Sequence, residues 1–221
     1  MELFAKWLPY ILAGVSVGGQ YALIAIGYTM VYGILRLINF AHGDMFMMAG
    51  LVSALPIWLS VIVVIIFTVA LGCTIEEVAY RPLRSAPRMS IMISAIGVSY
   101  FLQNIALYVT GGLTKTYPSI PFLQKTVTVL GAHTKMVTVI TPILTIALVF
   151  ALVMLINHTK IGMAMRAVSR DFETSELMGI DINRVIIVTF IIGSFLAAVG
   201  SVLFFSNYTG VNPMSGSMPG L

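Results

Sequence analysis

Long apolar runs separated by short charged segments are the dominant pattern of the chain. Five stretches carry no Asp, Glu, Lys or Arg side chain, and each is longer than the ~20 residues that a helix needs to cross the hydrocarbon core of a bilayer. They are Trp7 to Leu35, Met45 to Ile75, Met89 to Thr114, Met136 to Thr159 and Val185 to Leu221. The pattern predicts an all-α protein, a polytopic bundle of transmembrane helices, and it predicts one transmembrane domain over residues 1–221.

The basic residues predict the orientation of this bundle. Eight of the twelve lie on one side if Arg36, the cluster Arg81 to Arg88 and the segment Lys160 to Arg184 share that side. Lysine and arginine are enriched in cytoplasmic loops, so this side is predicted to face the cytoplasm. The four remaining lysines, at positions 6, 115, 125 and 135, then lie outside.

About six spans alternate correctly under this orientation. The expected spans are Trp7 to Leu35, Asp44 to Pro56, Ile57 to Ile75, Met89 to Val109, Val137 to Ile156 and Val185 to Phe205. Aromatic rings then fall near the outer interface, which favours amphipathic rings, at Trp7, Tyr10, Trp58, Tyr108 and Tyr208, while Tyr80 falls near the inner one.

The second span is too short for a full crossing, because only about a dozen residues separate Asp44 from Pro56 and each helical residue rises 1.5 Å. One interpretation is a half-helix or re-entrant segment, which is tolerated where protein or a water-filled cavity satisfies the backbone and which would indicate a translocation path. The other is a tilted helix that begins earlier, near Asn39.

The connection from Gly111 to Lys135 contains Lys-Thr-Val-Thr-Val-Leu-Gly, in which β-branched residues alternate before a turn former. This pattern predicts a small hairpin. It could be a docking surface for an extracytoplasmic partner, or a cap over the ends of the spans.

Composition supports a membrane protein, since 59% of the residues are hydrophobic and 9% are charged, against ~25% charged in soluble domains. The net charge of +4 does not indicate nucleic acid binding, because the basic residues are divided among short loops. Met1 to Met30 lacks the pattern of a cleavable signal peptide and is expected to be a retained span. Cys73 has no partner for an intrachain disulfide and is expected to pack.

Three polar residues, Asn39, His42 and Asp44, occur together at the junction of the first two spans. Ionisable groups at membrane depth are candidates for function, so the three could form a proton or substrate pathway. Alternatively, Asp44 caps the second span by accepting backbone N–H bonds. The cap is the favoured interpretation.

The segment from Asn157 to Arg184 is the most informative polar part of the chain. Asp171 is placed to cap a short helix that begins at Phe172, and Glu173 would lie in its first turn. Gly179 would end the helix in the left-handed conformation. A helix of two turns is marginal in water, so either the ends of the spans or a separate protein must hold it.

No site for energy coupling is evident within the chain. The sequence contains no Gly-x-x-x-x-Gly-Lys-Ser/Thr loop and no plausible Ser-His-Asp set. A metal site is not expected, because His42 and Asp44 supply only two ligands. Small residues at helical spacing, Gly14 and Gly18 and then Gly193, Ala197 and Ser201, permit close helix packing within one bundle or, less commonly, at a dimer face.

Several runs resemble the permease subunits of branched-chain amino acid ABC importers, over nearly the whole chain. They are Tyr21 to Asp44 with its Ile-Asn-Phe-Ala-His-Gly-Asp end, Glu76 to Arg84, Ile93 to Gly97, Phe101 to Asn104 and Leu177 to Val185. Glu173 to Gly179 is similar to the Glu-x-x-x-x-x-Gly loop by which such permeases contact their ATPases, although Thr174 and Ser175 replace its two typical alanines. Family members continue beyond Asn212 to Gly220, so the resemblance implies that the C-terminal part of the fold is missing.

The resemblance implies a transport subunit that is not itself an enzyme, in the cytoplasmic membrane of a prokaryote. Leucine, isoleucine and valine would be its substrates, and alternating access its mechanism. Expected partners are a second permease subunit, two cytoplasmic ATPases that hold ATP and Mg²⁺, and an extracytoplasmic substrate-binding protein; no cofactor is expected in this chain. Asp171, Glu173, Glu176 and Gly179 would form the ATPase-coupling loop. The alternative is a stand-alone carrier or channel in which Asp44 and His42 couple transport to an ion.

Overall fold

The computed structural model describes residues 2–36, 38–52, 57–84, 86–117, 123–129, 132–208 and 210–216. Side chains are described in the same ranges except at residues 2–6, 57–59, 88, 129 and 132. Leu37, Pro56 and the last five residues lie outside the described part, as does the side chain of Trp58.

Five helices of the described chain are long and apolar enough to cross a membrane: Trp7–Leu35, Ser60–Leu83, Met89–Thr110, Met136–His158 and Ile182–Asn207. They correspond to α1 (Glu2–Leu35), α3 (Ile57–Ile75) with its extensions η1 (Glu76–Tyr80) and η2 (Arg81–Leu83), α4 (Arg88–Thr110), α5 (Met136–His158) and α8 (Ile182–Asn207). The prediction of a polytopic all-α bundle is confirmed.

Three shorter helices complete the set within the described residues: α2 (Ala41–Leu51), α6 (Lys160–Arg170) and α7 (Phe172–Leu177). The 11 residues of α2 rise about 16 Å, roughly half of the hydrocarbon core. Arg36, Ile38 and Asn39 are not helical. Of the two interpretations of the second span, the structure therefore has the half-helix, which begins at Ala41.

The strands are short and lie in two pairs. β2 (Thr126–Val129) pairs antiparallel with β3 (Ala132–Lys135), which confirms the predicted hairpin. β1 (Lys115–Thr116) pairs with β4 (Gly210–Val211), which joins the end of α4 to the chain that follows α8.

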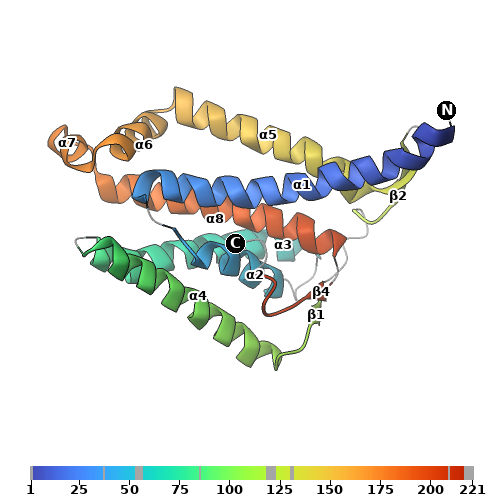
Figure 1. The fold of residues 1–221 in the computed structure, drawn as a ribbon, viewed down its shortest axis with the longest axis horizontal. Coiled ribbons are helices and arrows are strands. Elements are labelled where there is room, and N and C mark those ends of the chain that lie inside the picture. The colour runs from blue at the N-terminus through green and yellow to red at the C-terminus, as the bar shows by residue number, and fades with distance from the viewer. Residues whose placement is uncertain are drawn as a thin grey trace.

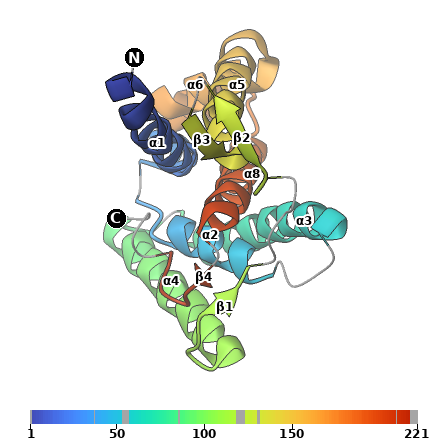
Figure 2. The same cartoon turned by 90° about the vertical axis from the view of Figure 1, so that its right-hand side faces the viewer.

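Helix α8 is the centre of the bundle (Figures 1 and 2). It packs on α1 and α5 on one side and on α2 and α3 on the other, and α4 covers the outer side of α2. Close packing depends on small residues, because a Cβ at Gly193 would lie 3.2 Å from the carbonyl oxygen of Gly27. Ala197 and Ser201 are fully buried, so this series packs within the bundle. A Cβ at Gly14 or Gly18 would meet nothing within 4 Å.

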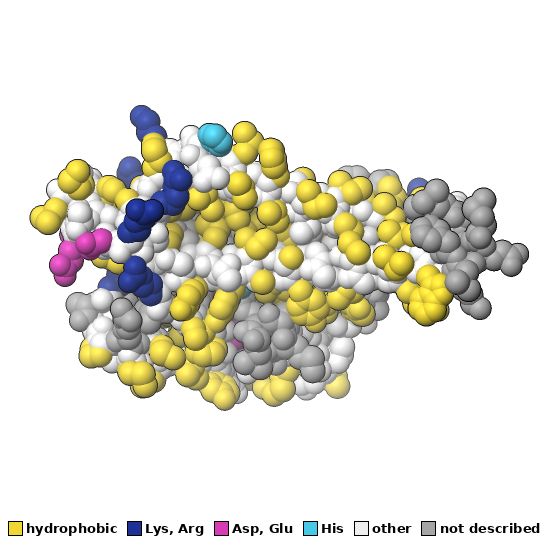
Figure 3. All heavy atoms as spheres, turned by 45° about the horizontal axis from the view of Figure 1, so that its top comes forward, with side chains coloured by type: hydrophobic (Ala, Val, Ile, Leu, Met, Phe, Trp, Pro, Cys, Tyr) yellow, Lys and Arg dark blue, Asp and Glu magenta, His cyan; other side chains and the backbone are white. Residues whose placement is uncertain are grey.

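The molecule has two chemically different ends along its long axis. Apolar side chains are spread along the length of the face in Figure 3, whereas basic and acidic side chains gather where α6, α7 and the start of α8 lie. We call this the arginine end. The opposite end, where α1 begins and β2 and β3 lie, is the hairpin end.

The aromatic positions only partly follow their predictions. Trp7, Tyr10, Tyr108 and Tyr208 are 61%, 73%, 89% and 47% exposed, as expected of rings that face lipid or its interface. Tyr80 is different, since only 4% of it is exposed. Tyr80 lines the cavity at the arginine end, but the bundle covers it: its ring packs against Phe190 and its hydroxyl has a buried partner in Asn39.

Candidate functional site

A capped two-turn helix, α7, is the main feature of the arginine end. The carboxylate of Asp171 accepts hydrogen bonds from the backbone N–H groups of Glu173 and Thr174 at 3.1 and 3.3 Å. The hydroxyl of Thr174 donates to the same carboxylate at 2.5 Å. The prediction that Asp171 caps a helix beginning at Phe172 is confirmed.

The other end of α7 closes as predicted at Gly179. This residue has a φ of 83°, which is strained for residues with a Cβ. Its N–H donates to the carbonyl of Glu176 at 2.9 Å, and the N–H of Ile180 donates to Ser175 at 3.1 Å. These two bonds form a Schellman motif, so both ends of α7 are fixed by local sequence.

The two faces of α7 have different surroundings. Phe172 and Ile180 pack against the main apolar cluster of the bundle, and Ser175 is buried. On the other side Leu177 and Met178 are 87% and 79% exposed. The bundle therefore holds one face of α7 and leaves an apolar tip beside charged residues.

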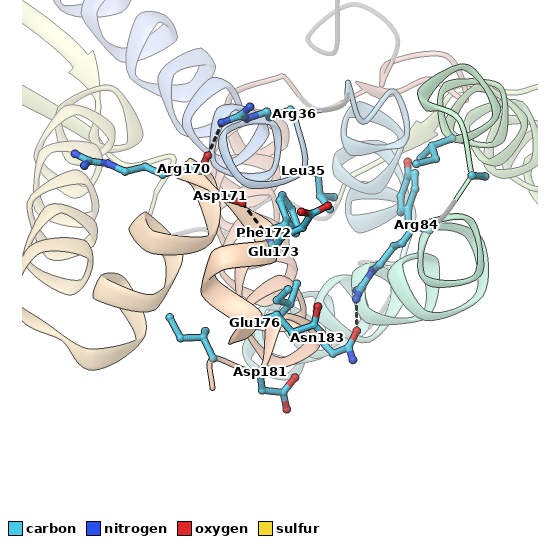
Figure 4. A pocket seen from close by; sticks show the side chains of 15 residues that line it. Leu35, Arg36, Arg84, Arg170, Asp171, Phe172, Glu173, Glu176, Asp181 and Asn183 are labelled. Atoms are coloured by element: carbon cyan, nitrogen blue, oxygen red, sulfur yellow. Dashed lines mark hydrogen bonds between the residues drawn. The ribbon is translucent and has the colours of Figure 1, made fainter. Parts of the chain in front are cut away.

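A cavity of about 680 Å³ lies beside α7 and extends between α1, α4, α8 and the η1–η2 segment. Figure 4 shows the side chains that line it. Carboxylates come from Asp171, Glu173, Glu176 and Asp181, and guanidinium groups from Arg36, Arg84 and Arg170. Of the predicted coupling-loop residues, Asp171, Glu173 and Glu176 thus line this cavity, and Gly179 does not. Within the described part of the chain, neither Glu173 nor Glu176 forms an ion pair.

Arg36 joins two helix ends at this cavity. It ends α1 with a φ of 52°, and its guanidinium donates to the carbonyls of Ser169 and Arg170 at 2.9 and 3.1 Å. Figure 4 shows the bond to Arg170. These carbonyls belong to the last turn of α6, where a cation is favoured by the helix dipole. From the sequence, Arg36 was used only to predict the orientation of the bundle in the membrane. Its contact with α6 spans more than 130 positions, and no local sequence pattern indicates such a contact.

Arg84 forms a second connection, between η1 and α8. Its guanidinium pairs with the carboxylate of Glu76, which is fully buried, and also donates to the side chain of Asn183 in the first turn of α8. Figure 4 shows the bond to Asn183. Glu76 was not singled out from the sequence, although its position directly after an apolar run could have indicated a buried charge.

The three polar residues near the start of α2 do not form one relay. Asn39 accepts hydrogen bonds from the backbone N–H of Ala41 at 3.1 Å and from the hydroxyl of Tyr80 at 2.7 Å. His42 lies against α1, where its Nε2 would be 2.9 Å from a Cβ at Gly27. Asp44 lies toward α4 instead, and accepts hydrogen bonds from Ser99 and Gln103.

Asp44 is not the cap of α2, so the favoured interpretation is wrong. The helix begins at Ala41, which places Asp44 within the first turn, and its carboxylate is engaged by side chains of α4. Asn39 satisfies a backbone donor at the start of α2 instead. The helix starts three residues before the predicted position, because Ala41, His42 and Gly43 pack inside the bundle.

The described residues contain no group of three His, Cys, Asp or Glu side chains that could hold a metal ion. The described part of the chain has two other notable features: a charged cavity with a protruding helix at one end, and a buried carboxylate on a half-helix. Together with five helices that are long and apolar enough to cross a membrane, these features are those of a multi-pass membrane protein.

Comparison with known proteins gives the family. A family model described as "Branched-chain amino acid transport system / permease component" matches residues 10–220. The chain is similar to the high-affinity branched-chain amino acid transport system permease protein LivH of Escherichia coli strain K12, with 40% identity over 239 residues that cover 100% of this chain and 77% of LivH. LivH of Salmonella typhimurium strain LT2 is 39% identical with the same coverage.

A third relative, the permease protein BraD of Pseudomonas aeruginosa, is 36% identical over 97% of this chain and 76% of BraD. No solved structure matches the chain significantly. The chain belongs to the branched-chain amino acid permease family of ABC-type transport systems, whose members are transport subunits.

Proposed function

We propose that this chain carries branched-chain amino acids across the cytoplasmic membrane by alternating access, driven by ATPase subunits that bind α7. The observation that carries the proposal is the two-faced α7: its inner face is held by the bundle, and its tip of Leu177 and Met178 is left exposed. A contiguous apolar tip outside the bundle is typical of a docking site.

The proposed movement follows from how α7 is held. Force on α7 reaches α8 through the short link at Ile180 and Asp181, and it reaches α1 through Arg36, which is bonded to the end of α6. The cavity beside α7 gives the helix room to move. ATP hydrolysis then biases the bundle between inward-open and outward-open states by differential contact energy.

The remaining subunits of the proposed transporter are a second permease, two cytoplasmic ATPases that hold ATP and Mg²⁺, and an extracytoplasmic substrate-binding protein. Leucine, isoleucine and valine are the proposed substrates, because the relatives are named as branched-chain amino acid permeases. The arginine end faces the cytoplasm in this arrangement, by the bias of basic residues.

Replacing Leu177 tests the docking. The chain is co-expressed with candidate ABC-type ATPases, and the ATPase that co-purifies with it is quantified. A carboxylate placed in an apolar docking contact costs about 2 kcal/mol or more, so Leu177→Asp is expected to reduce co-purification by at least about tenfold. Glu173→Gln and Gly179→Val are expected to reduce it as well.

The matched control is Leu113→Asp, since Leu113 is 70% exposed beyond the other end of α4. It should leave co-purification unchanged, and all variants should insert into the membrane as the parent chain does. Equal association of Leu177→Asp and Leu113→Asp would contradict docking through α7. If an ion gradient then also drove uptake without the ATPase, the stand-alone carrier would be the correct interpretation.

A further inference from the structure

Asp44 is a buried carboxylate without a cation. Only 2% of its surface is exposed. Its two hydrogen-bond partners, Ser99 and Gln103, are neutral, and no described Lys, Arg or His forms an ion pair with it. A charged carboxylate in a low-dielectric interior is costly unless a positive group is present, so the site is suited to a cation that comes from outside the chain.

The position of this carboxylate along the membrane normal is set by α4. This helix has 23 residues from Arg88 to Thr110, and Ser99 is its middle residue, about 16 Å from either end at 1.5 Å per residue. Because the hydroxyl of Ser99 donates to Asp44, the carboxylate lies near the middle of the bilayer. Ionisable residues at this depth are associated with substrate and ion pathways.

A half-helix and a turn of the chain meet at Asp44. The first is the half-helix α2, whose first turn contains it. The second is the segment that follows β4, which returns to α2 (Figure 1). At Gly216 this segment approaches so closely that a Cβ there would overlap the carbonyl oxygen of Gly43 and would lie 3.0 Å from the Cα of Asp44. Broken elements that meet at the midplane commonly form binding sites in transporters.

The partners of Asp44 orient its carboxylate without neutralising it. Ser99 and Gln103 are four residues apart on one face of α4, and Gln103 also donates to Ser99 at 3.3 Å. The amide of Gln103 donates to one carboxylate oxygen at 3.1 Å, and Ser99 donates to the other. Because both carboxylate oxygens of Asp44 accept a hydrogen bond, the carboxylate is held in one orientation. Its remaining lone pairs can accept hydrogen bonds from a ligand only in the directions that this orientation allows.

We propose that Asp44 binds the α-ammonium group of the transported amino acid at the middle of the membrane, and that Ser99 and Gln103 are positioning residues. This inference rests on the proposed transport function. The ligand class is a primary ammonium carried by a small apolar molecule. His42 takes no part, since it faces α1 on another side of α2.

The test measures leucine uptake by the complete transporter in proteoliposomes, together with subunit assembly and basal ATPase activity. Removing one member of a buried charge pair leaves the other charge without compensation and weakens binding strongly. Asp44→Asn is therefore expected to lower kcat/KM for leucine on the order of 100-fold, with assembly and basal ATPase activity retained. Asp44→Glu keeps the charge and is expected to recover part of the uptake.

The matched control is Glu77→Gln, which removes a carboxylate that is 63% exposed and paired with Arg81. It should change uptake by less than about twofold, as is usual for exposed pairs. Uptake by Asp44→Asn within threefold of the parent would overturn the proposal. So would loss of parent uptake on adding a protonophore at constant ATP, because Asp44 would then carry a proton.

A second variant decides the question if Asp44→Asn does not assemble. Gln103→Met removes one positioning donor and is expected to raise KM for leucine about fivefold with kcat retained; an unchanged KM would overturn the proposal. Failure of the proposed function gives a different result, because the parent transporter itself would then lack ATP-driven leucine uptake.

Discussion

Single side chains at the arginine end carry charges whose effects differ with their surroundings. Asp171 is exposed, yet the hydroxyl and N–H of Thr174, the N–H of Glu173 and the nearby Arg36 hold the pKa of its carboxyl below its ordinary value. The physical cause is that donors favour the ionised form. The capping carboxylate of α7 is therefore charged at every physiological pH.

This pKa shift predicts how the stability of α7 depends on pH. Because the pKa is lower in the folded state, the stabilisation is fully present above the pKa of the unfolded chain and is lost as pH falls through the folded pKa. Hydrogen exchange of the α7 amides, corrected for intrinsic pH dependence, should stay constant from neutral pH to about 4 and rise several-fold below it. Asp171→Ala should show the fast rate throughout. Equal exchange in the parent and in Asp171→Ala at neutral pH would contradict the cap.

At the scale of elements, Arg36 and Arg84 each join separate helices at the arginine end. Arg36 bonds the end of α1 to the end of α6. Arg84 bonds η1 to the first turn of α8. These contacts join elements far apart in sequence next to α7, which is where a movement of that helix would be transmitted.

The buried pair of Arg84 and Glu76 predicts non-additive stability. Breaking a buried pair from one side leaves an uncompensated charge and costs about 3–5 kcal/mol. Arg84→Met should therefore lower thermal stability in detergent strongly, and the double variant with Glu76→Gln should recover much of it. The neighbouring exposed pair of Arg81 and Glu77 is the control, since removing either partner there should cost less than about 1 kcal/mol. Additive losses in the double variant would contradict a direct interaction.

At the scale of the whole molecule, the two ends differ enough to predict which side of the membrane each one faces. In a background with Cys73→Ser, Glu173→Cys should be protected from a membrane-impermeant maleimide in intact cells, and Leu113→Cys should react. Both should react after permeabilisation. Labelling of Glu173→Cys from outside at the rate of Leu113→Cys would reverse the orientation given by the basic residues.

The sequence by itself determined the membrane bundle, the hairpin and both ends of α7. These features depend on local rules: the length of apolar runs, alternation of β-branched residues before a turn, and the preference of Asp for N-caps and of Gly for left-handed positions. The resemblance carried by Tyr21 to Asp44 and the other matching runs also gave the family correctly.

Only the tertiary structure decided which face of α2 each polar residue takes and what it contacts there. Asp44 was favoured as a cap, but its partners are Ser99 and Gln103, 55 and 59 positions further along the chain. Tyr80 was expected at the interface, and the bundle buries it on Asn39. Such contacts depend on how helices are rotated and packed against each other, and a repeating apolar run carries no information on rotation, because all of its faces are equally hydrophobic.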